Sequence, residues 1–253
     1  MIKKIHYVWF GGKPLPENVK SCINSWKRYL PDWEIIQWNE SNFDTNHFRW
    51  VREALSVKKY AFAADFVRLY VLNKMGGVYL DTDVEIYRNL EPLLKNSVVC
   101  GIQNHHYGVD CSKVVSEQGI DKQSGQLVSW FCVQAGFIYA EPNNPFLVHC
   151  LDKLYEKGNR AFIKQDGTTN QFVIDLRLML ELKEYGAVFR DKTQYLKQID
   201  LMLYNSTFFA TRKSKCKDSY LVHWFDQSWK PANSISMWLK KFIKQKLYFI
   251  YRK

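Results

Sequence analysis

The chain has 253 residues, 47% hydrophobic and 16% aromatic, which is enough apolar material to fill one sizeable core. Its formal net charge of +11 predicts an attraction to anions such as nucleic acid, an anionic membrane leaflet or diphosphate-bearing substrates. The six cysteines show no C-x-x-C spacing, and no uninterrupted apolar stretch reaches 18 residues. We therefore expect a protein of the reducing cytosol, without a zinc site, disulfide framework, signal peptide or membrane-spanning helix.

The first predicted strand covers residues 4–10 and is stopped by Gly11 and Gly12. Ligands of open α/β sheets bind beyond the carboxyl ends of the strands, so Trp9 and these glycines are candidates for a nucleotide site. A core tryptophan is the alternative for Trp9, and His6 is expected to be a hydrogen-bonded core residue. A helix from Pro16 to Leu30 and a strand over 33–38 then predict a parallel, Rossmann-like half.

The most informative stretch is 58–85. Apolar residues at helical spacing predict a helix that ends at Gly76 and Gly77. A strand over 78–84 is expected next, and its period of two would direct Tyr79, Asp81 and Asp83 to the same face. Two carboxylates this close favour a divalent cation with oxygen ligands, Mn²⁺ or Mg²⁺, although a surface turn is the alternative.

The helix before this strand carries a second pair of charged residues, Asp65 and Arg68, three positions apart on one face. Such a pair can form an ion pair, or it can contact the phosphate and ribose of a nucleotide.

The later part of the chain is harder to interpret. We expect a short strand over 98–102, a long polar loop over 103–126 that contributes to an acceptor site, and a strand over 130–140. Proline and asparagine then introduce a helix after Pro145, and Asn170 is expected to cap another helix. The two predictions for His223, a core strand residue or a pocket group, are equally weighted.

Motifs in three parts of the sequence together resemble those of a known protein family. The patterns AD-x-x-R at 64–68 and GG-x-YLD-x-D at 76–83 resemble the DXD sugar-binding region of glycosyltransferase family 32, which is shared with initiating mannosyltransferases, capsule enzymes and, distantly, clostridial glucosylating toxins. The patterns IH-x-x-W-x-G at 5–11 and H-x-x-x-x-SW at 223–229 extend it. The resemblance implies an α/β fold of GT-A type, a Rossmann-like mixed sheet flanked by helices.

The resemblance also implies roles for individual residues. Asp81, Asp83, Asp65 and Arg68 would be the catalytic group, with the last two holding ribose and sugar hydroxyls. The metal would be held by Asp81, Asp83 and Ser228. The nucleotide sugar would contact nine residues: Val8, Trp9, Gly11, Asp65, Arg68, Tyr79, Asp81, Ser228 and Trp229.

These implications predict a metal-dependent, retaining glycosyltransferase that uses a nucleotide-diphosphate sugar, UDP-galactose or UDP-glucose, and a saccharide or lipid-linked acceptor. A capsule, surface polysaccharide or glycolipid of a bacterial cell is the expected product. We predict a catalytic domain over 1–235 and a basic amphipathic tail over 236–253, which either binds an anionic membrane surface or packs on the domain. The expected location is cytoplasmic, at the inner face of the cell membrane.

Two other classes of protein remain open. A Mg²⁺-dependent phosphohydrolase also uses clustered aspartates, but the sequence offers no second spaced carboxylate cluster for a two-metal site. A non-catalytic basic protein could bind nucleic acid or other anions, yet no recognisable module or arginine stripe is present. No nucleic-acid partner is therefore expected.

Overall fold

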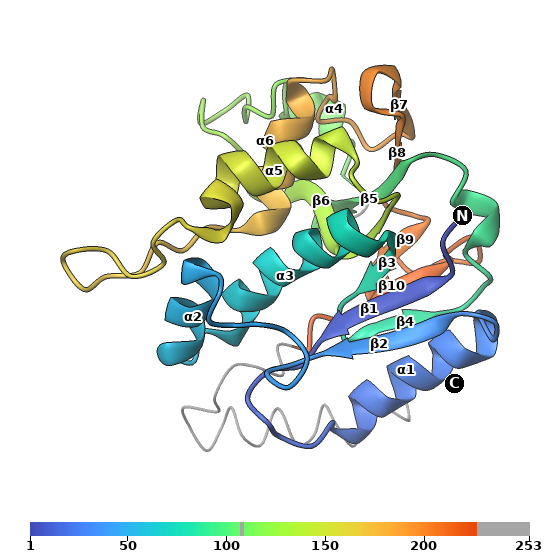
Figure 1. Cartoon of the computed structure of the whole chain (residues 1–253). Helices are drawn as coiled ribbons and strands as arrows, with labels where there is room; N and C mark the ends of the chain where they lie inside the picture. Colours follow the sequence, from blue (N-terminus) through green and yellow to red (C-terminus); the bar gives the residue numbers. More distant parts are fainter. Residues whose placement is uncertain (107–108, 227–253) are drawn as a thin grey trace, which may run out of the picture.

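The computed structural model describes residues 1–106 and 109–226 of the chain. Its centre is a seven-stranded sheet with the order β2-β1-β3-β6-β5-β8-β7 (Figure 1). The strands are β1 (Lys4–Val8), β2 (Glu34–Trp38), β3 (Gly77–Leu80), β5 (Val98–Asn104), β6 (Phe131–Ala140), β7 (Gln194–Leu196) and β8 (Leu201–Tyr204). β1 runs parallel to β2 and β3, whereas β6 runs antiparallel to both of its neighbours. The sheet is therefore mixed, with a parallel first half as predicted.

A small second sheet lies beside the first. It contains β4 (Val84–Ile86), β10 (Leu221–His223) and β9 (Phe209–Thr211), in the order β4-β10-β9. β10 pairs antiparallel with β4 and parallel with β9. The chain passes from one sheet to the other through the three residues that separate β3 from β4, so the Asp-Thr-Asp segment joins the two sheets.

Helices cover both faces of the large sheet. They are α1 (Glu17–Tyr29), α2 (Arg49–Ser56), α3 (Tyr60–Met75), α4 (Cys111–Val114), α5 (Pro145–Tyr155) and α6 (Ile174–Lys183), with short 3₁₀ turns η1 (Glu91–Leu93), η2 (Glu156–Gly158) and η3 (Lys197–Ile199). One apolar cluster joins α2, α3, α5 and α6 to the sheet, and a second joins α1 and the small sheet to the opposite face (Figure 1). The predicted α/β class, a mixed sheet flanked by helices, is confirmed.

The junction between α3 and β3 depends on two glycines. Gly76 has φ +64° and Gly77 has φ +105°, a region that favours glycine. A Cβ at Gly77 would lie 2.6 Å from the carbonyl oxygen of Lys4, so only glycine lets β3 begin this close to β1. The carbonyl of Gly76 accepts a hydrogen bond from Nε2 of His6 at 2.9 Å, and His6 is fully buried. Both the helix stop and the core histidine were predicted.

Three local predictions were wrong. Residues 78–84 are not one strand, because β3 ends at Leu80 and β4 begins at Val84 in the other sheet. The strand expected over 98–102 continues to Asn104, and the segment after it contains α4. Asn170 does not cap α6, which follows Val173 without a side-chain cap.

The cysteine and hydropathy predictions concern the whole chain. All six cysteines are free thiols, and five of them are buried. In the residues that the structure describes, no helix combines the length and the apolar character that crossing a bilayer requires. The predicted domain boundary at residue 235 and the tail over 236–253 lie outside the described residues.

Candidate active site

Asp81 and Asp83 lie in the turn between β3 and β4, at the carboxyl edge of the parallel strands. The Asp81 amide donates to the carbonyl of Gly136 on β6, and the Asp83 carbonyl accepts from the Trp224 amide. The side chain of Asp83 is held as well, because its Oδ2 accepts from the Asp226 amide at 2.8 Å. The turn is thus fixed by strands on both sides.

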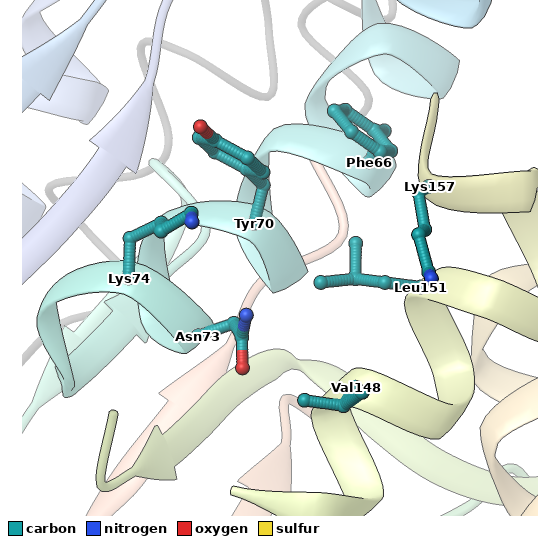
Figure 2. A pocket seen from close by; sticks show the side chains of 7 residues that line it. All are labelled: Phe66, Tyr70, Asn73, Lys74, Val148, Leu151 and Lys157. Carbon is teal, nitrogen blue, oxygen red and sulfur yellow. The ribbon is translucent and has the colours of Figure 1, made fainter. Parts of the chain in front are cut away.

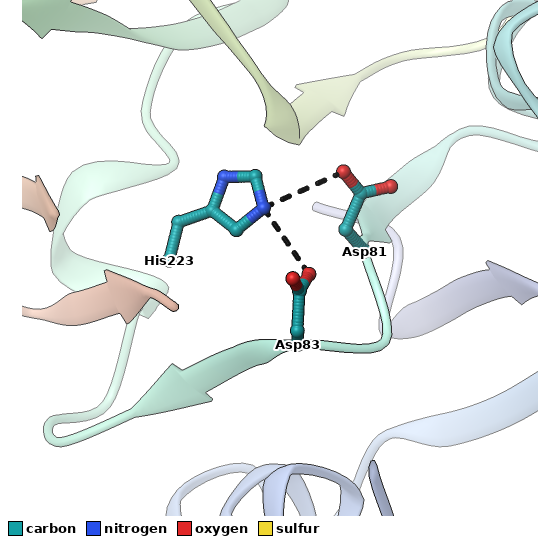
Figure 3. Close-up of side chains that lie close together, drawn as sticks. All are labelled: Asp81, Asp83 and His223. Atoms are coloured by element: carbon teal, nitrogen blue, oxygen red, sulfur yellow. Dashed lines mark ion pairs between the residues drawn. The ribbon is translucent and has the colours of Figure 1, made fainter. Parts of the chain in front are cut away.

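The two carboxylates converge on His223, the last residue of β10 (Figure 3). His223 Nε2 lies 3.1 Å from Asp83 Oδ1 and 3.8 Å from Asp81 Oδ2. One ligand atom from each of the three residues lies within 4.8 Å of the others, as in a metal site. The prediction that both carboxylates point the same way therefore holds, although they converge through a turn and not through one strand.

Arg68, on α3, forms an ion pair with Asp81. Its Nη2 lies 3.0 Å from Asp81 Oδ1 and 3.1 Å from Asp65 Oδ1, and the residue is only 4% exposed. The Tyr79 hydroxyl donates to the same Asp81 oxygen at 3.1 Å, while the guanidinium lies over the Tyr79 ring. Oδ1 of Asp81 is therefore occupied by protein donors, and Oδ2 is the atom that faces His223.

Gly136 provides the space for this arrangement. A Cβ at this position of β6 would lie 2.9 Å from Cε1 and Nδ1 of His223 and 3.2 Å from Asp81 Oδ2. Any side chain there would displace the imidazole or the carboxylate. The glycine in the Gln134-Ala135-Gly136 segment is therefore part of the site.

Burial and charge set the protonation of the cluster. Burial raises the pKa of Asp65 to about 7, although the positive charge of Arg68 acts to lower it. Burial also raises the pKa of Asp81. For Asp83, burial is outweighed by the charge and hydrogen bond of His223, so its pKa is lowered. Burial likewise opposes the charged form of His223, but Asp83 raises its pKa above the ordinary value. Asp83 and His223 thus form an ion pair in the protein without metal.

Asp175, in the first turn of α6, is a fourth carboxylate that the sequence analysis missed. Its Oδ1 accepts from the Ala135 amide at 3.1 Å, one residue before Gly136. After burial, its charge contributes to the raised pKa of both Asp65 and Asp81. A histidine that ligates a metal is neutral, so with all four carboxylates ionised and Arg68 as the one positive charge, three negative charges remain uncompensated, which suits a divalent cation.

The residues predicted for the nucleotide lie at the end of β1, next to β3 in the sheet. Val8 is buried, and Trp9 is half-buried with its indole N–H donating to the Lys13 carbonyl. Gly11 has φ +92°, and a Cβ there would lie 2.9 Å from the Tyr60 ring. Because β1 and β3 are parallel, this loop and the Asp-Thr-Asp turn lie at the same edge of the sheet.

Ser228 and Trp229, which were predicted to contact the nucleotide sugar, lie outside the described residues. The structure therefore assigns no position to Ser228 as a metal ligand. His223, from the same motif, contributes its side chain to the carboxylate cluster, and the Asp226 amide of that segment donates to Asp83.

A second cluster of possible metal ligands lies on the helical face, where Glu181 of α6 and Glu184, the residue after this helix, meet His149 of α5. Lys153 Nζ lies 2.8 Å from Glu181 Oε2 and also pairs with Glu184. The lysine already provides a counter-charge, so this group is a surface ion network.

Comparison with known proteins identifies the region that carries the aspartates. A family model described as a glycosyltransferase sugar-binding region containing a DXD motif matches residues 16–100. Inositol phosphoceramide mannosyltransferase 1 of Schizosaccharomyces pombe is 25% identical over 167 residues, 63% of this chain and 44% of that protein. Inositol phosphoceramide mannosyltransferase 3 of the same organism is 35% identical over 100 residues, 36% of this chain and 27% of that protein. The chain spans less than half the length of these curated relatives.

Two solved structures with a similar chain trace are named as glycosyltransferases. The PaToxG glycosyltransferase has a TM-score of 0.45 at 17% identity, covering 72% of this chain and 69% of that one. The galactosyltransferase LgtC, in complex with donor and acceptor sugar analogues, has a TM-score of 0.42 at 12% identity, covering 96% and 94%. The family model on residues 16–100 includes both aspartates of the turn after β3, so this region of the chain is similar to glycosyltransferase sugar-binding regions that contain a DXD motif.

Proposed function

We propose that the protein transfers a hexose from a nucleotide-diphosphate sugar to a hydroxyl of a glycan or lipid-linked acceptor, in a reaction that needs a divalent cation. The observation that carries this proposal is the convergence of Asp81, Asp83 and His223 at the carboxyl edge of the sheet. The match of residues 16–100 to a glycosyltransferase sugar-binding region supports this class of reaction.

Asp81, Asp83 and His223 would hold the cation, Mn²⁺ or Mg²⁺, and Ser228 stays a predicted further ligand. The donor set fits such an ion because it offers two carboxylates and one imidazole within 4.8 Å. When bound, a divalent cation neutralises the diphosphate and the charge that develops on the leaving group. An imidazole among the ligands favours Mn²⁺ over Mg²⁺, which prefers oxygen.

The side chains around the cluster would position the donor. We propose that Trp9, with Val8 and Gly11, contacts the base, because the loop after β1 and the Asp-Thr-Asp turn lie at the same edge of the sheet. Asp65 and Arg68 were predicted to hold ribose and sugar hydroxyls. Because Arg68 is 4% exposed and bridges two carboxylates, we propose that it orients Asp81 and Asp65, which would make the sugar contacts.

The proposed chemistry retains the configuration of the transferred sugar. The bond between the anomeric carbon and the diphosphate oxygen breaks, the acceptor oxygen bonds to the same face, and its proton passes to the departing phosphate. This front-face route requires no carboxylate nucleophile. Water exclusion and fixed charges at the site would provide most of the acceleration.

The acceptor side is proposed to include the segment after β5. His106 stacks on Trp130 with ring centroids 4.3 Å apart, and His105 lies near Phe225, which stacks on His223. These rings connect the segment to the cluster and offer aromatic faces to a sugar.

We also propose an acceptor class and a cellular location for the protein. The curated relatives are named as mannosyltransferases of inositol phosphoceramide, a glycolipid acceptor, which supports a lipid-linked acceptor here and adds mannose to glucose and galactose as candidate sugars. A capsule or surface polysaccharide precursor is the alternative acceptor. A lipid-linked acceptor would place the protein at a membrane surface, which fits the net charge of +11 and the basic tail.

The test is a panel of UDP-glucose, UDP-galactose, UDP-N-acetylhexosamines and GDP-mannose with Mn²⁺, analysed for released nucleotide with and without acceptors. We expect one donor to be hydrolysed slowly alone and faster with an acceptor, and no reaction in EDTA. Phosphate release from simple phosphate esters, with no reaction from any nucleotide sugar, would favour a phosphohydrolase. Co-purifying nucleic acid with no response to nucleotide and Mn²⁺ would favour an anion-binding protein.

A further inference from the structure

A pocket of about 170 Å³ lies between α3 and α5 (Figure 2). Its apolar lining comes from Phe66 on α3 and from Val148 and Leu151 on α5. A cavity of about 150 Å³ accommodates a benzene-sized molecule, so this pocket can hold part of a small ligand. Val148 is 43% exposed, so the apolar lining continues to the surface.

The pocket is separate from the carboxylate cluster, although both use α3. At 3.6 residues per turn, Phe66 and Asn73 lie on one face of the helix, whereas Asp65 and Arg68 lie on another. A ligand in the pocket would therefore contact the back of the helix whose other face orients Asp81.

The rim of the pocket is positively charged. Lys74 and Lys157 line it from opposite sides, and its lining contains no carboxylate (Figure 2). Among the described residues, Lys74 has no acidic partner within 4.0 Å, and Lys157 reaches only Asp152, at 4.0 Å between two exposed side chains. The Asn73 Oδ1 is buried and has no hydrogen-bond partner in the described part of the chain. The polar side of the pocket thus matches an anionic ligand that also has a hydroxyl to donate, such as a phosphate that keeps one P–OH group.

The backbone after α5 brings Lys157 to this rim. Glu156 and Lys157 have φ +49° and +56°, and Gly158 follows at +99°. Consecutive left-handed residues that are not glycine are uncommon, and strain of this kind concentrates at functional sites such as ligand clamps. A sharp turn therefore ends α5 and places a lysine across from α3.

We propose that this pocket binds the phosphate headgroup of an anionic lipid, with Lys74 and Lys157 on the phosphate and the first carbons of the chain over Val148 and Leu151. Inorganic phosphate would pair with the lysines but leave the apolar lining exposed. A neutral apolar molecule would cover the lining and leave both ammonium groups without a partner. The inference does not depend on the proposed transfer reaction.

The experiment titrates the full chain with dihexanoyl phosphatidic acid below its micelle concentration, by calorimetry. Dihexanoyl phosphatidylcholine and inorganic phosphate are the comparison ligands. We expect phosphatidic acid to bind about tenfold or more tightly than either, because only it supplies both the anion and the chain. The double variant Lys74→Gln/Lys157→Gln should lose about tenfold in affinity.

The matched control is Lys192→Gln/Lys197→Gln, which removes the same charge from exposed residues near β7. It should bind like the wild type. A further variant, Val148→Asn, should weaken phosphatidic acid several-fold and leave weak phosphate binding unchanged, and it decides the matter if the double variant does not fold. Equal affinity for phosphate and phosphatidic acid, or equal losses in the pocket and control variants, would overturn the proposal.

Discussion

Replacing Gly136 by alanine adds one methyl group at the point where β6 faces the cluster. The new Cβ would lie 2.9 Å from two atoms of the His223 ring, whereas carbon contacts are ordinarily about 3.5–4.0 Å. The imidazole must therefore move by more than about 0.5 Å, which is enough to weaken its 3.1 Å contact with Asp83. A misplacement of this size can cost about 10- to 100-fold in rate.

The assay for Gly136→Ala measures sugar transfer as a function of Mn²⁺ concentration, with urea unfolding as the measure of stability. We expect weaker Mn²⁺ activation and a 10- to 100-fold loss of transfer, while overpacking costs about 1–3 kcal/mol of stability. Gly101→Ala on β5 is the control for added volume, because its Cβ would press on the Phe209 ring and not on His223 or Asp81. Normal Mn²⁺ activation by folded Gly136→Ala would refute this view of the site.

Three further predictions concern charge. The pKa of Asp65 is about 7 in the folded protein against 3.8 in the unfolded chain, so between these values the folded protein keeps a proton on this carboxyl that the unfolded chain has lost. The free energy of unfolding of the metal-free protein should therefore fall by about 2–4 kcal/mol as the pH rises from 4 to 7. Urea unfolding in EDTA should show this fall in the wild type and not in Asp65→Asn. Arg68→Gln removes the cation shared by Asp65 and the partly exposed Asp81, and should cost about 3 kcal/mol together with transfer activity. An active, stable variant would contradict that role. Hydrogen bonds from Asn96 and Ser97 lower the pKa of Asp200 to about 2, so this carboxylate stabilises the fold above pH 4 and the stabilisation is lost as the pH falls towards 2. Because the group is only partly buried, Asp200→Asn should lower the free energy of unfolding in urea by about 1 kcal/mol at pH 7 and by less at pH 3.

The best sequence predictions were those with local causes. The end of α3 at Gly76 and the parallel start of the sheet follow from glycine conformation and hydrophobic spacing, which act over a few residues. His6 was identified as a core residue for the same reason, since it lies in an apolar strand.

The errors have a physical origin too. The alternation of apolar and polar residues continues through Asp81 and Asp83, so the pattern could not show that the chain leaves one sheet there and enters another. Asp175 carries only the local signal of an acidic residue in a first helical turn. Its proximity to the cluster arises from packing of α6 on β6, a contact between distant parts of the chain that a single sequence does not reveal.

His223 illustrates the intermediate case. Its motif suggested either a core residue or a pocket group, and spacing could not choose between them. The pairing of β10 with β4 places it opposite Val84, directly after the Asp-Thr-Asp turn. The structure therefore supplies the missing long-range contact.

The most direct measurement for the central claim is Mn²⁺ binding, followed by the paramagnetic signal of the free ion, in the wild type, Asp83→Asn and His223→Gln. Sugar transfer is measured on the same samples. We predict that both variants keep cooperative unfolding, bind Mn²⁺ about tenfold to 100-fold more weakly, and lose transfer in parallel. Unchanged Mn²⁺ affinity in both variants, or full transfer by the wild type in metal-free buffer, would contradict the assignment of Asp81, Asp83 and His223 as the metal site.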